Sequence, residues 1–210
     1  MNTINKSLLD GRLICLTPID VEKDAEVEAK WTHDPEYLRL LSAETVRPLS
    51  PAHLKKKYED LEKKMAESRD QFYFAVRLQK EAVVDGENSG TDADNKRLVG
   101  FTELTWVSWN HGAAYLKLGI GDPGDRGKGY GSEALALMLN FSFDELNLLR
   151  ITAVIPEYNR VAQHTFERVG FIEEVRRRQA LHRYGRRWDV IHMGILRAEW
   201  EEKYRVMSNK

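Results

Sequence analysis

A glycine-rich loop in front of a long apolar run constrains this chain more than any other feature. The stretch GDPGDRGKGYGSEALALMLNFSF begins at Gly121 and also carries Arg126 and Lys128. Glycine lacks a Cβ, so the backbone can take a positive φ and a ligand can approach it closely. The first N–H groups of a helix have no internal partner and lie at the positive end of the helix dipole. The loop therefore predicts a site for an anion, most often a phosphate.

Composition limits the classes of protein that this chain can belong to. Its 210 residues are 42% hydrophobic and 31% charged, which predicts one globular domain over residues 1–210. The formal net charge of −1 argues against nucleic acid or an acidic membrane as the partner. Cys15 is the only cysteine, so an internal disulfide is excluded and no metal is expected. No signal-peptide core and no apolar run of about 20 residues is present, so we expect a cytoplasmic location.

Hydrophobic periodicity and breaker residues predict a mixed α/β domain with a β-α-β-α-β core near its C-terminal half. Ser50 and Pro51 are typical of a helix start, and Asn159 and Gly170 of a helix start and end. The polar, acidic segment 81–96 is expected to be a flexible loop. The predicted strands are 12–19, 71–79, 97–109, 113–121, 149–155 and a hairpin over 171–196, and the predicted helices are 20–34, 50–68, 129–145 and 159–170.

Two common phosphate-binding motifs fit the loop poorly. A mononucleotide P-loop needs Ser or Thr after the Gly-Lys pair, and here Gly129 follows Lys128. The loose dinucleotide form G-x-G-x-x-A is present from Gly129 to Ala134, but that motif needs a tight turn directly after a strand of a parallel crossover. The strand before this loop instead pairs in a predicted hairpin, which leaves the dinucleotide reading as the weaker alternative.

A third reading uses every residue of the loop. Residues 126–131 read R-x-x-G-x-G between a strand and a helix, and NRVAQHTFERVGF follows from Asn159. Together these segments resemble the GNAT acyltransferases, whose (Q/R)-x-x-G-x-(G/A) motif wraps the pyrophosphate of acetyl-coenzyme A. The two ends of the chain, GRLICLTPIDVEKDAEVEAKWTHDPE and YGRRWDVIHMGILRAEW, resemble the RimJ/RimL-type branch. The resemblance covers about residues 8–202.

The resemblance implies a fold and a cofactor site. The fold would be a central mixed, mostly antiparallel sheet flanked by helices, with a splayed central pair of strands. Acetyl-coenzyme A would be the co-substrate, with Asn159 bonding its pantetheine arm and the strand before the loop polarising the thioester. The implied cofactor-binding residues are Gly119, Ile120, Gly121, Arg126, Gly127, Lys128, Gly129, Tyr130, Gly131, Ser132, Asn159 and Phe166.

The implied chemistry is direct attack of a neutral amine on the thioester within a ternary complex. Glu103 is the first candidate for the proton acceptor and His192 the second. Each has a purely structural alternative: a solvent-facing carboxylate on an alternating strand, and a buried, hydrogen-bonded histidine. Many family members carry Tyr as general acid seven residues after the Asn. This chain has Phe166 there, so a water or another group would protonate the thiolate, or it would leave unassisted.

The acceptor is expected to be a small-molecule amine or a peptide N-terminus, and the protein a candidate homodimer. Aromatic side chains near carboxylates suit a cationic amine, although they also suit an ordinary core. A non-catalytic acyl-coenzyme A sensor with the same fold, and less favourably a dinucleotide-binding oxidoreductase, remain as alternatives. The candidate acceptor residues are Trp31, Tyr37, Trp106 and Tyr115.

Overall fold

The computed structural model describes residues 8–43, 45–79 and 96–208. The predicted flexible loop 81–96 therefore lies outside the described residues, apart from Lys96. The strands are β1 (Ile14–Thr17), β2 (Phe72–Leu78), β3 (Leu98–Ser108), β4 (Ala113–Ile120), β5 (Arg150–Pro156), β6 (Ile172–Arg183) and β7 (Arg186–Leu196). The helices are α1 (Val21–Thr32), α2 (Pro35–Leu41), α3 (Pro51–Ser68), α4 (Tyr130–Asn140), α5 (Arg160–Val169) and α6 (Arg197–Ser208), with a 3₁₀ turn, η2 (Pro123–Asp125), and a π-helical turn, η3 (Phe141–Glu145).

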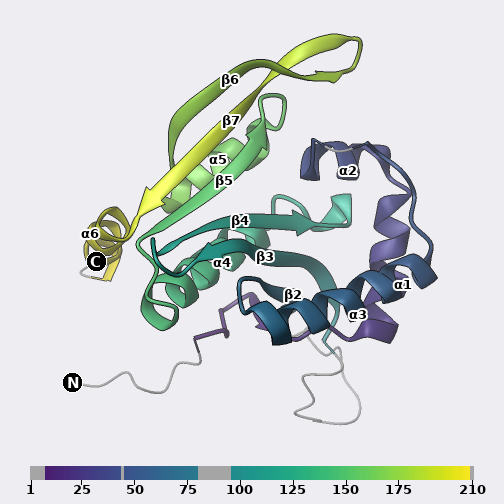
Figure 1. The fold of residues 1–210 in the computed structure, drawn as a ribbon, viewed down its shortest axis with the longest axis horizontal. Helices are drawn as coiled ribbons and strands as arrows, with labels where there is room; N and C mark the ends of the chain where they lie inside the picture. The colour runs from purple at the N-terminus through teal and green to yellow at the C-terminus, as the bar shows by residue number, and fades with distance from the viewer. Residues whose placement is uncertain (1–7, 44, 80–95, 209–210) are drawn as a thin grey trace.

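The strands form one sheet in the order β1-β2-β3-β4-β5-β7-β6 (Figure 1). Every neighbouring pair is antiparallel except β4 and β5, which run parallel and pair only over Ala113–Tyr115 and Arg150–Thr152. Beyond Tyr115 the two strands separate, so the predicted mixed sheet with a splayed central pair is confirmed. A dinucleotide-binding fold would instead need a mostly parallel sheet.

Two hydrophobic cores pack against opposite faces of the sheet. Side chains alternate between the faces of a strand, and in β2 Val76 joins one core whereas Tyr73, three residues earlier, joins the other. The larger core lies between the sheet and α4, with Leu135 and Met138 fully buried. The smaller core lies beneath α1 and α3, which cover the other face at one end of the sheet (Figure 1). The sheet is therefore covered by a separately packed layer of helices on each face.

The predicted helix boundaries are confirmed where the sequence carries capping residues. The Asp20 and Ser50 side chains accept backbone N–H bonds at the starts of α1 and α3, and Asn159 does so for α5. Gly170 ends α5 with φ of 115°, a left-handed conformation that glycine adopts at little cost. The helices α2 and α6 were not predicted. Helix α2 has a clear start at Asp34 and Pro35 but only seven residues, too few to show a periodic pattern.

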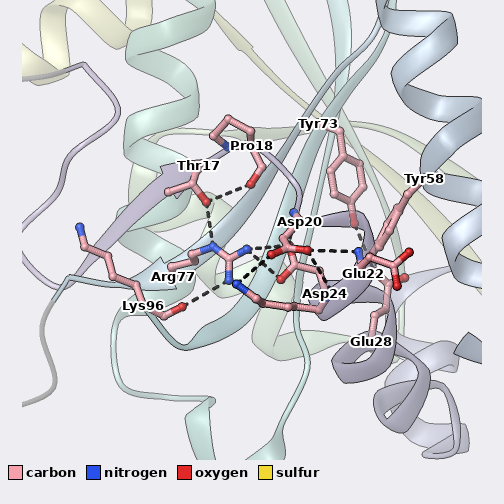
Figure 2. Close-up of polar contacts among 11 residues, drawn as sticks. Thr17, Pro18, Asp20, Glu22, Asp24, Glu28, Tyr58, Tyr73, Arg77 and Lys96 are labelled. Carbon is pink, nitrogen blue, oxygen red and sulfur yellow. Dashed lines mark hydrogen bonds and ion pairs between the residues drawn. The ribbon is translucent and has the colours of Figure 1, made fainter. Parts of the chain in front are cut away.

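A buried polar network joins α1 to the sheet (Figure 2). Arg77 of β2 binds both oxygens of Asp24 at 2.8 and 2.7 Å, and its Nε donates to Thr17. Burial raises the pKa of Asp24 despite this partner. One turn later, Glu28 accepts hydrogen bonds from the hydroxyls of Tyr58 and Tyr73. These contacts fix α1 against the sheet, and the chain leaving its C-terminal end carries Asp34 and Tyr37 toward β4.

Candidate functional site

The loop between β4 and α4 has the backbone that its glycines predict. Gly127 and Gly129 take φ values of 76° and 90°, in the left-handed region that side chains rarely adopt. A Cβ added at Gly127 would have no heavy atom within 4 Å, so the space beside it is open. Gly129 is the N-cap of α4 and offers no side chain to its first turn. The opening N–H groups of α4 are thus left for an external acceptor such as a phosphate.

The charged side chains of the loop divide into two groups. Asp125 is buried and accepts from both terminal nitrogens of Arg97 at 2.7 and 2.9 Å; these bonds hold its pKa below the usual value. Lys128 lies 3.4 Å from Asp125, at the exposed edge of this pair. Arg126 instead turns back and donates to the carbonyls of Ile120 and Gly121 at 3.3 and 2.9 Å. The Arg126 side chain therefore braces the end of β4, while its main chain shapes the loop.

The unpaired half of β4 presents main-chain groups toward β5. Gly121 donates to the carbonyl of Val99 at 3.0 Å, and Gly119 lies opposite Phe101 two residues earlier. Hydrogen-bonded pairs alternate along an antiparallel ladder, so the main chain of Gly119, like that of Gly121, bonds to β3. The N–H and C=O groups of Leu118 and Ile120 therefore point away from β3, toward β5. Ile120 is engaged by Arg126. Leu118, which the sequence had not singled out, thus joins Ile120 as a main-chain candidate.

Two of the predicted acceptor residues meet this strand. A Cβ on Gly121 would lie 2.0 Å from the Trp31 ring, and a Cβ on Gly119 would lie 3.2 Å from the Tyr37 hydroxyl. The two aromatic rings contact each other edge to face, with their centroids 6.1 Å apart. Trp31 also lines a pocket of about 590 Å³ beside the loop, together with Asp34, Arg97 and Gly121 among its residues. Glycine is thus required at positions 119 and 121 by close packing.

The other two predicted acceptor residues lie elsewhere. Trp106 is 80% exposed and Tyr115 is 43% exposed. Both are near the β3–β4 turn, where Thr105 pairs with Tyr115, at the opposite end of the hairpin from Gly121. The structure therefore does not bring them to Trp31 and Tyr37, which lie at Gly121 and Gly119.

The two candidate bases differ in their surroundings. Glu103 lies opposite Tyr73 and Lys117 in the sheet, with its side chain 14% exposed and 3.5 Å from the Lys117 ammonium. His192 of β7 lies opposite Val154, and its Nε2 is buried with no hydrogen-bond partner among the described residues. The structure thus places Glu103 on the hairpin that carries Gly119, and His192 across β5 from it.

The segment that begins at Asn159 makes more contacts within the protein than we expected. The Asn159 Oδ1 accepts from the N–H of Ala162, and its Nδ2 donates to the carbonyl of Leu40 at 3.0 Å. Both ends of this amide are therefore engaged within the protein. Phe166 is only 6% exposed and packs edge to face on Phe171 at 4.9 Å, as part of the larger core. In this structure Phe166 is a core residue.

Sequence reasoning missed how α2 is held. The Tyr158 hydroxyl donates to the carbonyl of Arg39 at 2.6 Å, next to the bond from Asn159 to Leu40. The Arg39 guanidinium lies 4.9 Å from the Tyr184 ring centroid on the β6–β7 hairpin. Residues 119 positions apart in sequence meet here, so no local pattern could have revealed the contact.

The described part of the chain has no group of three or more His, Cys, Asp or Glu side chains that could bind a metal ion. None of the helices described is both long enough and apolar enough to span a bilayer. The chemistry available at the site is that of its backbone donors and its cations. A diphosphate fits the open, left-handed glycines at the uncapped start of α4, and an extended chain with amide groups fits the free side of β4.

Comparison with known proteins agrees with this geometry. The chain is 32% identical over 105 residues to a spermidine N(1)-acetyltransferase of Vibrio cholerae, covering 50% of this chain and 60% of that protein. It is 26% identical over 164 residues to an N-acetyltransferase 9-like protein of Nematostella vectensis, covering 78% of this chain and 76% of that protein. The sequence match thus spans less than two thirds of the length of the Vibrio relative.

The fold is shared with solved structures. A Vibrio cholerae spermidine N-acetyltransferase, crystallised in complex with coenzyme A and spermine, superimposes with a TM-score of 0.71 at 23% identity. The superposition covers 90% of this chain and 98% of that one. The acetyltransferase (GNAT) domain matches residues 13–172, which include the loop, the splayed strands and the Asn159 segment. This chain therefore belongs to the GNAT acetyltransferase family.

Proposed function

We propose that this protein transfers the acetyl group of acetyl-coenzyme A to a primary amine by direct attack in a ternary complex. The observation that carries the proposal is the loop 126–131. Two left-handed glycines, Gly127 and Gly129, open onto an uncapped helix start, beside a strand whose free side offers main-chain donors and acceptors. A diphosphate followed by an extended amide-containing arm matches both features. Acetyl-coenzyme A has this shape and supplies an activated acyl thioester.

The residues of this chain would divide the work as follows. The N–H groups of Gly127 to Ser132 bind the diphosphate, and Lys128 adds a positive charge at its edge. The Leu118 and Ile120 main chain orients the arm. Glu103, 14% exposed and on the hairpin that carries Gly119, accepts the proton of the acceptor ammonium.

The first test is binding, measured by thermal shift and calorimetry. Acetyl-coenzyme A and coenzyme A should raise the melting temperature, whereas NAD should not. Stabilisation by NAD alone would select the oxidoreductase alternative. Release of free thiol should then be measured with peptides, polyamines and small amines as acceptors. Binding without turnover across a broad amine panel would select the sensor alternative.

The second test addresses the base. Glu103→Gln should lower kcat by about 10²-fold, the usual loss on removing a general base, with little change in acetyl-coenzyme A affinity. Lys117→Met is the matched control, because it removes the 3.5 Å ion pair and keeps the carboxylate. Equal losses in both variants would assign Glu103 a structural role. A large loss in His192→Asn, with Glu103→Gln active, would move the base to His192.

We propose that the chain is a RimJ/RimL-type enzyme, because the sequences of its two ends resemble that branch. We also propose that it is cytoplasmic and acts on a small amine or a peptide N-terminus. The Vibrio relative is a spermidine N(1)-acetyltransferase, which supports the amine class. One related solved structure is a dodecamer, and we propose a homodimer as the smallest assembly here. Size-exclusion chromatography with light scattering tests that assembly.

A further inference from the structure

The Tyr37 side chain is fixed in one position above β4. Asp34 caps α2 by accepting from the N–H of Glu36, so Tyr37 sits in the first turn of a well-defined helix. Its side chain is almost fully buried, with 3% of the residue exposed. The Trp31 ring contacts one side, and the Arg126 guanidinium lies 6.0 Å from the Tyr37 ring centroid. The ring therefore has little freedom to turn.

The Tyr37 hydroxyl is aimed at the unpaired part of β4. It would lie 3.2 Å from a Cβ at Gly119, so the absence of that Cβ leaves room for it. Gly119 lies beyond Tyr115, the last residue of β4 that pairs with β5. The hydroxyl thus lies over the face of the stretch of strand along which the acetyl end of the co-substrate would lie.

This hydroxyl has no hydrogen-bond partner among the residues that the structure describes. Two other buried tyrosines of the same core, Tyr58 and Tyr73, both donate to Glu28 (Figure 2). Burying a hydroxyl without a partner costs free energy, so such groups are rare and need an explanation. Burial, with the nearby charge of Glu28 as a second cause, raises the pKa of Tyr37 well above its usual value. The group therefore stays protonated at neutral pH and can donate.

We propose that Tyr37 is a catalytic residue, whose hydroxyl donates a hydrogen bond to the carbonyl oxygen of the acetyl group. This inference rests on the proposed function of the site. The carbonyl oxygen gains negative charge as the amine attacks, and a fixed donor aimed at that atom lowers the barrier without reorganisation. The O–H bond of Tyr37 stays intact, so no proton leaves it.

The test compares Tyr37→Phe with Tyr73→Phe, a matched control whose hydroxyl already has a partner. Binding of acetyl-coenzyme A and of coenzyme A is measured separately by calorimetry, because the acetyl carbonyl is present in the first only. We expect Tyr37→Phe to weaken acetyl-coenzyme A by about 2- to 10-fold and to leave coenzyme A unchanged. With an accepted amine, its kcat should fall by about 10²-fold.

Thermal stability provides an independent readout. Removing an unpartnered hydroxyl should leave the melting temperature unchanged or raise it, whereas Tyr73→Phe should lower it and keep kcat within about 2-fold. The role of Tyr37 would be overturned if Tyr37→Phe bound both ligands as tightly as wild type does. It would also be overturned if the variant lost the same factor of affinity for both. If wild-type protein binds neither ligand, the proposed function fails as well, which separates the two failures.

Discussion

The hydroxyl of Tyr158 donates to the main-chain carbonyl of Arg39 at 2.6 Å and thereby ties α2 to the corner between β5 and α5. The neighbouring Asn159 repeats this tie one residue along, to Leu40. Helix α2 also carries Tyr37, which lies over β4. Through these contacts α2 bridges the two strands that separate beyond Tyr115.

The first prediction concerns this connection. Tyr158→Phe should remove one hydrogen bond of about 0.5–1.5 kcal/mol and loosen α2. The KM for the amine should rise by about 2- to 10-fold, and amide exchange in α2 should become faster. Tyr184→Phe is the matched control, since it keeps the ring that packs on Tyr158 at 5.6 Å. Faster exchange in both variants to the same degree would refute a specific role for the Tyr158 hydroxyl.

The second prediction separates backbone strain from ligand contact at the loop. Gly127 and Gly185 have φ values of 76° and 72°, and a Cβ at either would have nothing within 4 Å. Alanine at each should therefore cost a similar amount, about 1 kcal/mol, from the left-handed conformation alone. Calorimetry should show at least a tenfold loss of coenzyme A affinity for Gly127→Ala and none for Gly185→Ala. Unchanged affinity in Gly127→Ala would contradict the loop assignment.

The third prediction follows from the Arg97–Asp125 pair. The hydrogen bonds from Arg97 hold the folded-state pKa of Asp125 below its unfolded value. The charged form thus adds stability above the unfolded pKa, about 3.9, and this contribution is lost as the pH falls through the folded pKa. Asp125→Asn should be about 1–3 kcal/mol less stable in urea unfolding at pH 7.

That difference should begin to shrink below about pH 4, where Asp125 becomes protonated in the unfolded chain, and should be lost once the pH falls below the lowered folded-state pKa of Asp125. Asp122→Asn serves as control, because an Asn side chain still accepts the N–H of Gly124 that Asp122 accepts at 2.7 Å. A stability gap between wild type and Asp125→Asn that persists unchanged at low pH would show that charge is not its source.

The fourth prediction concerns Phe166, which lies in the core against Phe171. Phe166→Tyr should bury an added hydroxyl and lower the free energy of unfolding by about 1–3 kcal/mol. Turnover should change by less than about tenfold, because attack by the amine, and not departure of the thiolate, is expected to limit the rate. A large rise in kcat without loss of stability would show that position 166 reaches the thiolate.

Local signals in the sequence predicted most of the elements and the loop. Gly129 and Gly131 lie at the start of α4, and Asn159 lies at the start of α5. Residues with such strong local preferences predict helix boundaries from the sequence alone. The rest depended on contacts between distant segments. The engagement of Asn159 by Leu40, and the burial of Tyr37 over Gly119, arise only when α2 packs across the sheet. That packing also brings Trp31 and Tyr37 to β4 while Trp106 and Tyr115 stay near the β3–β4 turn.

The seam between β4 and β5 gives the sheet a mechanical property. Each half is a continuous hydrogen-bonded sheet. Among the described residues, β4 and β5 pair over three residues each, Ala113–Tyr115 and Arg150–Thr152, and Gly112 accepts two further backbone bonds from Leu149 and Arg150. Gly119 lies four residues beyond Tyr115, the last paired residue of β4, which is a distance of about 13 Å along the strand. A rotation of about 5° about the seam would therefore displace Gly119 by about 1 Å relative to β5, a misplacement large enough to slow a group transfer by about 10²-fold. We therefore expect the angle between the two halves of the sheet to set the alignment of the reacting groups, and α2, which contacts both halves, to hold that angle.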